Sequence, residues 1–134
     1  MRRQLLTGLI MGQLLARLRA ALRRVVSNAD QPVIATDDFR VDLVTHEVTG
    51  PGDQPVRLTP TEWGVLEVLV RNRGKLVTQR QLLQEVWGPQ YEKETEYLRV
   101  YMGALRRKLE PIPSQPRYFI TEPGMGYRFV SETT

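Results

Sequence analysis

The sequence predicts an α+β domain in which short antiparallel strands come first, three helices follow, and a β-hairpin ends the chain. Three observations lead to this prediction. Apolar and polar residues alternate after residue 38, as they do in strands. Two helix starts led by threonine then introduce apolar residues at helical spacing, and a Gly-rich turn near the C-terminus separates two short apolar runs. With 134 residues, the chain has the length of one domain and an added N-terminal segment.

The added segment, residues 1–24, predicts a helical extension with one leucine face. Arginines interrupt its apolar run, so the segment is not expected to be a signal peptide, and it lacks the roughly 20 apolar residues of a membrane span. A helix lying on a membrane surface remains an alternative, but we favour a face that docks a partner. The leucines of this face are Leu14, Leu15, Leu18 and Leu22.

The polar, proline-containing stretch that begins at Ser27 predicts a linker over residues 25–35. The domain that follows, 36–132, begins with alternating residues at 39–43 and continues with short strand-like runs on either side of a Gly-Pro-Gly-Asp turn at 50–53. A small antiparallel meander is expected there.

Two helix starts follow the meander. Thr59 is placed as an N-cap, Pro60 as the first helical residue, and Glu62 as the residue that closes a capping box. Thr78 repeats the signal, with Gln81 expected to close the second box. A Gly-Pro pair marks the end of this second helix.

The third predicted helix, 95–109, has two contrasting faces. One is an apolar stripe formed by Leu98, Met102, Leu105 and Leu109. The opposite face is basic and slim, because Gly103 and Ala104 have almost no side chain. A slim, positive helix fits the major groove of DNA. The alternative is a solvated amphipathic helix whose glycine packs against a neighbour. The residues of this outer face are Glu96, Arg99, Val100, Gly103 and Arg107, with Arg106 at its edge.

The last predicted element is a β-hairpin over 118–130, with its turn at 123–126. Two short helices that lead into a third, followed by a hairpin, are the order of elements in a winged helix-turn-helix. The sequence therefore predicts this fold, with an antiparallel sheet at the start of the domain and the hairpin as the wing.

The composition argues against catalysis. The chain has no cysteine and one histidine, His46, which excludes disulfides, thiolate metal sites, a cysteine nucleophile and clusters of histidine ligands. The absence of cysteine also fits a reducing cytoplasm. We therefore expect no enzymatic activity, no cofactor or metal, and no small-molecule substrate, and we expect His46 to be an inert strand residue.

The charge is unevenly distributed. The formal net charge is +4, but residues 1–24 hold six arginines and no acid, so the rest of the chain carries a net charge of −2. Within that remainder, residues 71–108 hold nine basic residues against four acids. This local excess covers the second and third predicted helices, as the electrostatic footprint of a DNA-binding surface would.

Four separated motifs carry a family resemblance: L-T-P-T-E-W-x-V-L-E-x-L, a degenerate T-R-x-x-L-L-x-x-V-W-G, L-R-R-K-L-E and T-x-x-G-x-G-Y-R-F. In this order, over residues 36–131, they resemble the winged-helix effector domain of OmpR/PhoB-type response regulators. The third helix and the loop before it resemble the KdpE-like branch, which regulates a potassium-uptake operon. Residues 13–24 resemble the last helix of the receiver domain, and the rest of that domain, with its phosphoacceptor aspartate, has no counterpart in the sequence.

The resemblance implies a sequence-specific DNA-binding output domain of a two-component phosphorelay. It places helix 95–109 in the major groove and wing 118–130 at the minor groove, with Val100 in apolar base contact, Arg106 on a base or phosphate, and Thr121 near the minor groove. Tyr127 is expected either to contact phosphate or to pack, and Arg128 either to contact DNA or to be solvated. The expected DNA-binding residues are Thr78, Arg80, Arg99, Val100, Gly103, Arg106, Arg107, Thr121, Tyr127 and Arg128.

The loop before the third helix corresponds to the family's RNA polymerase contact, although Trp87 is equally compatible with a core position. Departures from the family pattern, at Glu96, Arg99, Ala104 and Pro123, mean that base preference cannot be copied from other members. The expected polymerase-contact residues are Trp87, Gly88, Gln90, Tyr91, Glu92, Lys93 and Glu94.

Two functions of different classes follow. The first is a transcription regulator that binds double-stranded DNA and RNA polymerase and forms at most a weak or DNA-assisted homodimer. The second is a protein-interaction module, favoured by the net charge of −2 outside residues 1–24; a related possibility is a truncated competitor without phosphorylation control. Steep salt dependence would distinguish DNA binding from docking through the leucine face.

Overall fold

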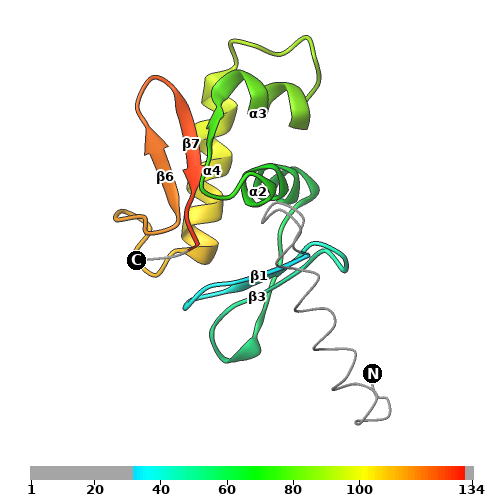
Figure 1. Cartoon of the computed structure of the whole chain (residues 1–134), viewed down its shortest axis with the longest axis vertical. Coiled ribbons are helices and arrows are strands. Elements are labelled where there is room, and N and C mark those ends of the chain that lie inside the picture. The colour runs from blue at the N-terminus through cyan, green and yellow to red at the C-terminus, as the bar shows by residue number, and fades with distance from the viewer. Residues whose placement is uncertain (1–31, 132–134) are drawn as a thin grey trace. The chain divides into compact units, whose positions relative to one another are not determined.

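The computed structural model describes residues 32–131, and the predicted N-terminal helix lies outside this range. Within this range the chain forms a small sheet, three helices and a hairpin, arranged as Figure 1 shows, so the expected winged helix-turn-helix is confirmed. The strands are β1 (Val33–Ala35), β2 (Arg40–Asp42), β3 (Glu47–Thr49), β4 (Pro55–Val56), β5 (Leu76–Thr78), β6 (Phe119–Glu122) and β7 (Gly126–Phe129). The helices are α2 (Pro60–Arg71), α3 (Gln79–Val86) and α4 (Thr95–Leu109), and a 3-10 turn spans Pro51–Asp53.

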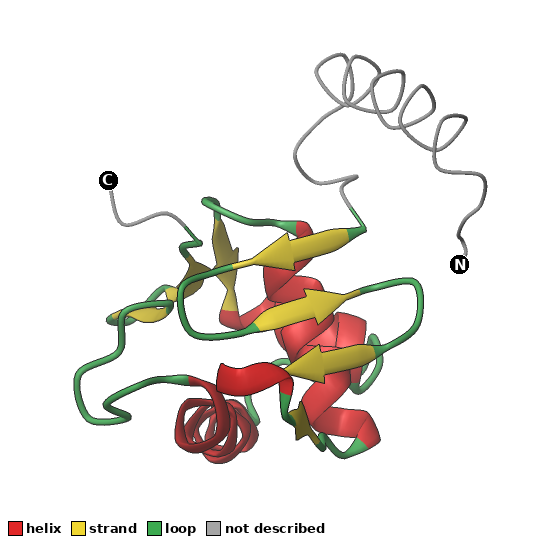
Figure 2. Ribbon diagram, turned by 90° about the horizontal axis from the view of Figure 1, so that it is seen from below, coloured by secondary structure: helices red, strands yellow, loops and turns green. Residues whose placement is uncertain are grey.

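The first sheet is antiparallel, in the order β1-β2-β3-β4. The central residues Ile34, Val41 and Val48 lie opposite one another and are buried, while their neighbours along each strand are more exposed. Figure 2 shows the strands of this sheet lying across one side of the helices.

The linker predicted over 25–35 extends too far toward the C-terminus, because Val33–Ala35 form the edge strand β1. This strand was missed since three residues are too few to show alternation. Its pairing is set by β2, through the register Ile34 to Val41. The exposed fraction of Ile34 is 2%, so it is a core residue of the domain.

The helix starts agree with their sequence signals in all but one detail. Thr59 and Glu62 form the predicted capping box, with the Thr59 amide 2.9 Å from Glu62 Oε1 and the Glu62 amide 3.2 Å from Thr59 Oγ1. Thr78 caps α3 by accepting a hydrogen bond from the Gln81 amide at 3.1 Å. The second box is not closed, because the Gln81 side chain donates to Glu85 instead.

The wing has one more strand than predicted. β5, between α2 and α3, pairs with β7, which gives a three-stranded sheet in the order β5-β7-β6. Gly126 makes this pairing possible, because a Cβ at that position would collide with the carbonyl oxygen of Val77. Since β5 ends at Thr78, the cap residue of α3, the wing is joined directly to the helix-turn-helix.

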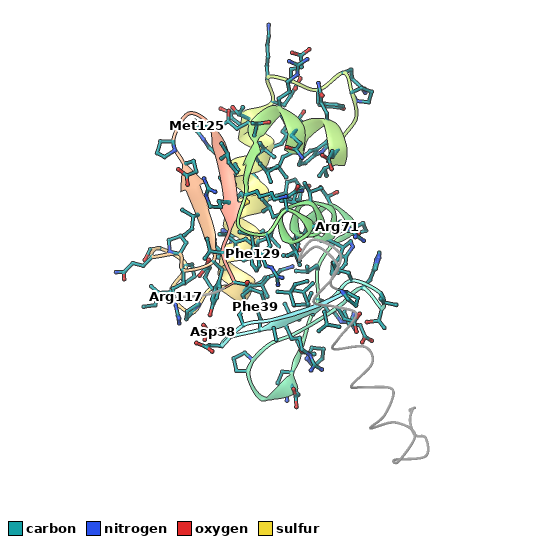
Figure 3. The ribbon with its side chains drawn as sticks, in the orientation of Figure 1. Asp38, Phe39, Arg71, Arg117, Met125 and Phe129 are labelled. Atoms are coloured by element: carbon teal, nitrogen blue, oxygen red, sulfur yellow. The ribbon has the colours of Figure 1, made fainter. Side chains whose placement is uncertain are left out.

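One apolar core serves both sheets and all three helices. Three aromatic residues join the two sheets at its centre: Phe39 lies 6.1 Å from Phe119 and 6.3 Å from Phe129, measured between ring centroids. The segment before β6 is also tied to the β1–β2 loop by a 3.3 Å ion pair between Arg117 and Asp38, and Figure 3 shows these two side chains beside each other. The wing and the first sheet are therefore held in place relative to each other by these aromatic contacts and this ion pair.

Candidate nucleic-acid interface

The two faces of α4 are as different in the structure as in the sequence. The predicted apolar stripe is buried, with exposed fractions between 0% and 4%. On the outer face, Val100 is 63% exposed and Arg99 and Arg107 are exposed. An apolar residue on a basic, solvent-facing helix surface is suited to contact with base methyl groups.

Gly103 lies at the middle of this outer face. The nearest heavy atom that a Cβ would meet there is a guanidinium nitrogen of Arg107, at 3.4 Å on the same helix. The interpretation in which Gly103 allows a neighbouring element to approach is therefore wrong. Gly103 and Ala104 add almost no side chain between Val100 and Arg107, so a ligand surface can come close to the helix backbone there.

Arg106 differs from the other arginines of α4, because it is half-buried and bound within the protein. Its guanidinium donates two hydrogen bonds to the carbonyl oxygen of Phe119, at 3.1 and 2.6 Å, and one to Thr121 Oγ1 at 2.8 Å. Burial lowers the pKa of Arg106, against the opposing effect of Tyr127 and Glu110. Two residues expected to contact DNA separately, Arg106 and Thr121, thus contact each other.

Tyr127 is 5% exposed, which supports its packing role over a phosphate contact. Burial raises the pKa of Tyr127, while the positive charges of Arg106 and Arg99 partly oppose the increase. Arg128 is also engaged within the wing: Nε lies 3.1 Å from Glu122 Oε2, and a terminal nitrogen donates to the Gly74 carbonyl oxygen at 2.9 Å. Both residues lie on β7, and their side chains are bound within the domain and do not add to the exposed basic surface that α4 presents.

The first turn of α3 contributes a second positive position. Thr78 uses its hydroxyl to cap the helix, and Arg80, with 68% of its side chain exposed, points away from the core. The Arg80 guanidinium lies 3.9 Å from Glu92 in the loop before α4, a long and exposed ion pair of small stabilising effect. A phosphate at this helix N-terminus would compete with Glu92 for Arg80.

The loop between α3 and α4 is held to α4 by aromatic rings. Trp87 lies 5.6 Å from Tyr97 and 5.5 Å from Tyr101, and Tyr91 lies 6.2 Å from Tyr97. Trp87 and Tyr91 are therefore anchors for the loop, while their neighbours Gln90, Glu92 and Lys93 are exposed. Gly88 has a φ of +137°, a conformation that favours glycine at the start of the loop.

The sequence analysis missed one residue of this face and two residues that hold α4 in place. Tyr97, 43% exposed, lies one turn before Val100 on α4. Lys108 donates from the last turn of α4 to Glu62 at 2.6 Å and to the Arg57 carbonyl oxygen at 2.8 Å. Glu110 follows α4, is buried, and accepts hydrogen bonds from three consecutive backbone amides, those of residues 117–119. The three-residue spacing of Tyr97 and Val100 could have placed Tyr97 on the outer face from the sequence. The partners of Lys108 and Glu110 are known only once the chain is folded.

A basic helix with an exposed outer face, preceded by a second helix and flanked by a β-sheet wing, defines a winged helix-turn-helix domain. The family model for the C-terminal domain of transcriptional regulatory proteins matches residues 53–129. The chain therefore belongs to that family.

The matching relatives carry regulator names. The chain is 60% identical over 121 residues to the transcriptional regulatory protein KdpE of Mycobacterium tuberculosis, a match that covers 89% of this chain and 53% of that protein. It is 52% identical over 120 residues to the KDP operon transcriptional regulatory protein KdpE of Escherichia coli, with the same coverage of both chains. The chain thus spans about half the length of these relatives.

Solved structures agree on the fold. The response regulator DrrB of Thermotoga maritima, an OmpR/PhoB homologue, superposes with a TM-score of 0.68 at 28% identity, over 89% of this chain and 52% of DrrB. The DNA-binding domain of Klebsiella pneumoniae RstA, solved with the RstA box, has a TM-score of 0.67 at 24% identity, over 76% of this chain and all of that domain. The architecture is therefore that of OmpR/PhoB-type domains.

Two further findings concern residues 32–131. No helix in that range is long and apolar enough to cross a membrane. The same residues contain no cluster of three or more histidine, aspartate or glutamate side chains placed to hold a metal ion.

Proposed function

We propose that the chain binds double-stranded DNA in a sequence-specific manner, as the output domain of a two-component response regulator in the cytoplasm. One observation carries the proposal: the outer face of α4 combines exposed Arg99, Val100 and Arg107 with Gly103, which has no side chain to keep DNA away from the helix. Family membership and the names of the relatives support the same function. The KdpE relatives favour a promoter of a potassium-transport operon as the target.

In this proposal α4 lies in the major groove. Arg99 and Arg107 reach guanine edges or phosphates, and a bidentate arginine–guanine pair would contribute roughly 1–3 kcal/mol of discrimination. Val100 contacts thymine methyl groups, and Arg80 with the first turn of α3 contacts phosphate beside the groove. Arg106, Tyr127 and Arg128 contribute less by direct contact, because their polar groups or rings are engaged within the domain.

The loop between α3 and α4 is proposed as the surface for RNA polymerase. Its aromatic residues pack on α4 and hold the backbone of the loop in place. The polar side chains of Gln90, Glu92 and Lys93 are exposed on this loop. A second chain on the same DNA is proposed to associate weakly. A tight dimer in DNA-free sedimentation would contradict that part of the proposal.

The experiment is fluorescence-anisotropy titration with promoter DNA of the KDP operon and with scrambled DNA, over a salt series. We expect at least about a hundredfold preference for the promoter and a steep loss of affinity with rising salt. Arg107→Ala should weaken binding to both DNAs and make the salt slope shallower by about 1 if Arg107 contacts a phosphate. Equal, weak binding of the unaltered chain to both DNAs would refute sequence-specific recognition.

The second candidate, a protein-interaction module, is suggested by the net charge of −2 outside residues 1–24, but family membership and the names of the relatives do not favour it. The same titration distinguishes it, because docking through an apolar face depends little on salt. Absence of DNA binding at low salt, together with capture of a helical partner that salt does not release, would favour this alternative.

A further inference from the structure

We infer that Arg106 is a positioning residue that fixes the wing to α4, rather than a group that reads DNA. The inference rests on the proposed DNA-binding function and concerns how one duplex is reached by helix and wing together. It gives Arg106 a role different from that of Arg99 and Arg107, which share its charge and its helix.

The first argument is the number of internal bonds that Arg106 makes. The two hydrogen bonds to the Phe119 carbonyl oxygen and the one to Thr121 use both Nε and a terminal nitrogen of the guanidinium. A guanidinium that turned toward a base would exchange these charge-assisted bonds for new ones, so its gain from DNA would be reduced. Arg107, the next residue, is exposed and remains available for DNA.

The second argument is the place of Phe119 in the wing. It belongs to β6, an edge strand that pairs only with β7. Its amide donates to Glu110 Oε2 at 2.7 Å, and its carbonyl oxygen accepts from Arg106. Both backbone polar groups of this residue are thus held by side chains from the C-terminal part of α4 and its cap.

The third argument is geometric. The Arg106 bond to Thr121 continues the contact one step further along β6, toward the turn at Met125, which Figure 3 shows at the tip of the hairpin. β7 pairs with β5, whereas the hydrogen bonds that tie Phe119 and Thr121 of β6 to α4 and its cap residue are made with Arg106 and Glu110. Removing Arg106 should therefore loosen β6 while leaving β5 unchanged.

A fixed wing has a consequence for recognition. A helix in the major groove and a wing at the adjacent minor groove bind one duplex most tightly when their spacing is set before binding. Otherwise the ordering of the wing reduces the affinity for the correct site. Arg106 would thus contribute to sequence preference without contacting a base.

The test uses the full chain and three variants: Arg106→Met, which keeps an unbranched stem, Thr121→Val, which removes one acceptor at nearly constant shape, and the double variant. Backbone ¹⁵N relaxation without DNA measures the order of β6, with β5 as the internal control. In Arg106→Met the order parameters of residues 119–122 should fall from about 0.85 toward 0.6, and those of residues 76–78 should not change. Thr121→Val retains both bonds to Phe119, so it should fold normally and show a smaller effect.

The binding assay with promoter and scrambled DNA completes the test. We expect Arg106→Met to lower the preference for promoter DNA by about tenfold, and the double variant to lower it no further, because both changes remove the same bridge. Unchanged β6 order in Arg106→Met would overturn the inference, and so would a loosened β6 with undiminished preference. If the unaltered chain itself shows no preference, the proposed function and the recognition part of this inference both fail, while the relaxation data still decide whether Arg106 holds β6.

Discussion

The ammonium nitrogen of Lys108 lies 2.6 Å from Oε1 of Glu62, which joins the last turn of α4 to the first turn of α2. The same Glu62 oxygen accepts the amide of the cap residue Thr59. Because the Glu62 side chain is only 9% exposed, this ion pair is better shielded from water than the other ion pairs within residues 32–131. It fixes the C-terminal end of α4 on the helix behind it.

Replacing Lys108 should therefore destabilise the domain although Lys108 lies on the proposed DNA-binding helix. Lys108→Met leaves the buried Glu62 carboxylate without its charged partner, which we expect to cost about 1–3 kcal/mol in the free energy of unfolding. Urea denaturation measures the change. Arg107→Met, at the exposed neighbouring position, is the control and should stay within about 0.5 kcal/mol of the unaltered chain. Equal effects of the two substitutions would contradict the structural role of Lys108.

The same pair predicts how stability depends on pH. Burial alone would raise the pKa of Glu62, but hydrogen bonds from Lys108 and Thr59 outweigh burial, so the pKa lies below its ordinary value of 4.5. A carboxyl group with a lowered pKa in the folded state stabilises the fold fully above its ordinary value. This contribution is lost as the pH falls through the folded-state pKa. The difference in unfolding free energy between the unaltered chain and Glu62→Gln should accordingly shrink as the pH is lowered below about 4.5. A difference that stays constant from pH 7 to pH 3 would show that the charge of Glu62 is not what stabilises the fold.

Glu110 provides a second structural test. Its buried carboxylate accepts three hydrogen bonds from the amides of Arg117, Tyr118 and Phe119, at 2.7, 2.9 and 2.7 Å. Glu110→Gln directs an amide NH₂ at some of these donors, so we expect a loss of about 1.5–3 kcal/mol. Hydrogen exchange should accelerate at the amides of Tyr118 and Phe119 more than in β5. Glu85→Gln, on the exposed side of α3, is the matched control, and exchange rates as slow in Glu110→Gln as in that control would refute the clamp.

The sequence was sufficient to predict the helices and the two faces of α4. Their signals are local: Thr59 and Glu62 are three residues apart, and the apolar residues Leu98, Met102, Leu105 and Leu109 of α4 recur every three or four residues. The interactions that the sequence could not predict join residues that lie far apart along the chain. Glu62 and Lys108 are 46 positions apart, and Arg106 lies 13 and 15 positions from its partners Phe119 and Thr121. Such pairings depend on how the strands and helices pack. The same holds for β5, because its three residues form a strand by pairing with β7.

This distinction explains the main revision to the predicted site. The sequence alone predicts Arg99, Arg106 and Arg107 all as DNA-contacting residues, because all three lie outside the apolar stripe of the helix. In the fold, β6 passes within hydrogen-bond distance of Arg106 only. Charge on a helix face thus identifies candidates for DNA contact, and tertiary contacts decide which of them remain available.

Val100 offers the sharpest test of base contact, because its 63% exposed side chain can bury against DNA without losing any internal hydrogen bond. If Val100 contacts a thymine methyl group, replacing that thymine by deoxyuridine removes the contact and nothing else on the major-groove edge. Loss of one buried methyl group should cost roughly 0.8 kcal/mol, or about fourfold in affinity. Val100→Ala should bind more weakly and lose sensitivity to this one replacement. Val44→Ala, at a 74% exposed valine in the β2–β3 turn, is the matched control and should keep the full sensitivity. A chain that binds equally well to every singly substituted site, or a Val100→Ala variant as sensitive as the unaltered chain, would show that Val100 does not read a thymine.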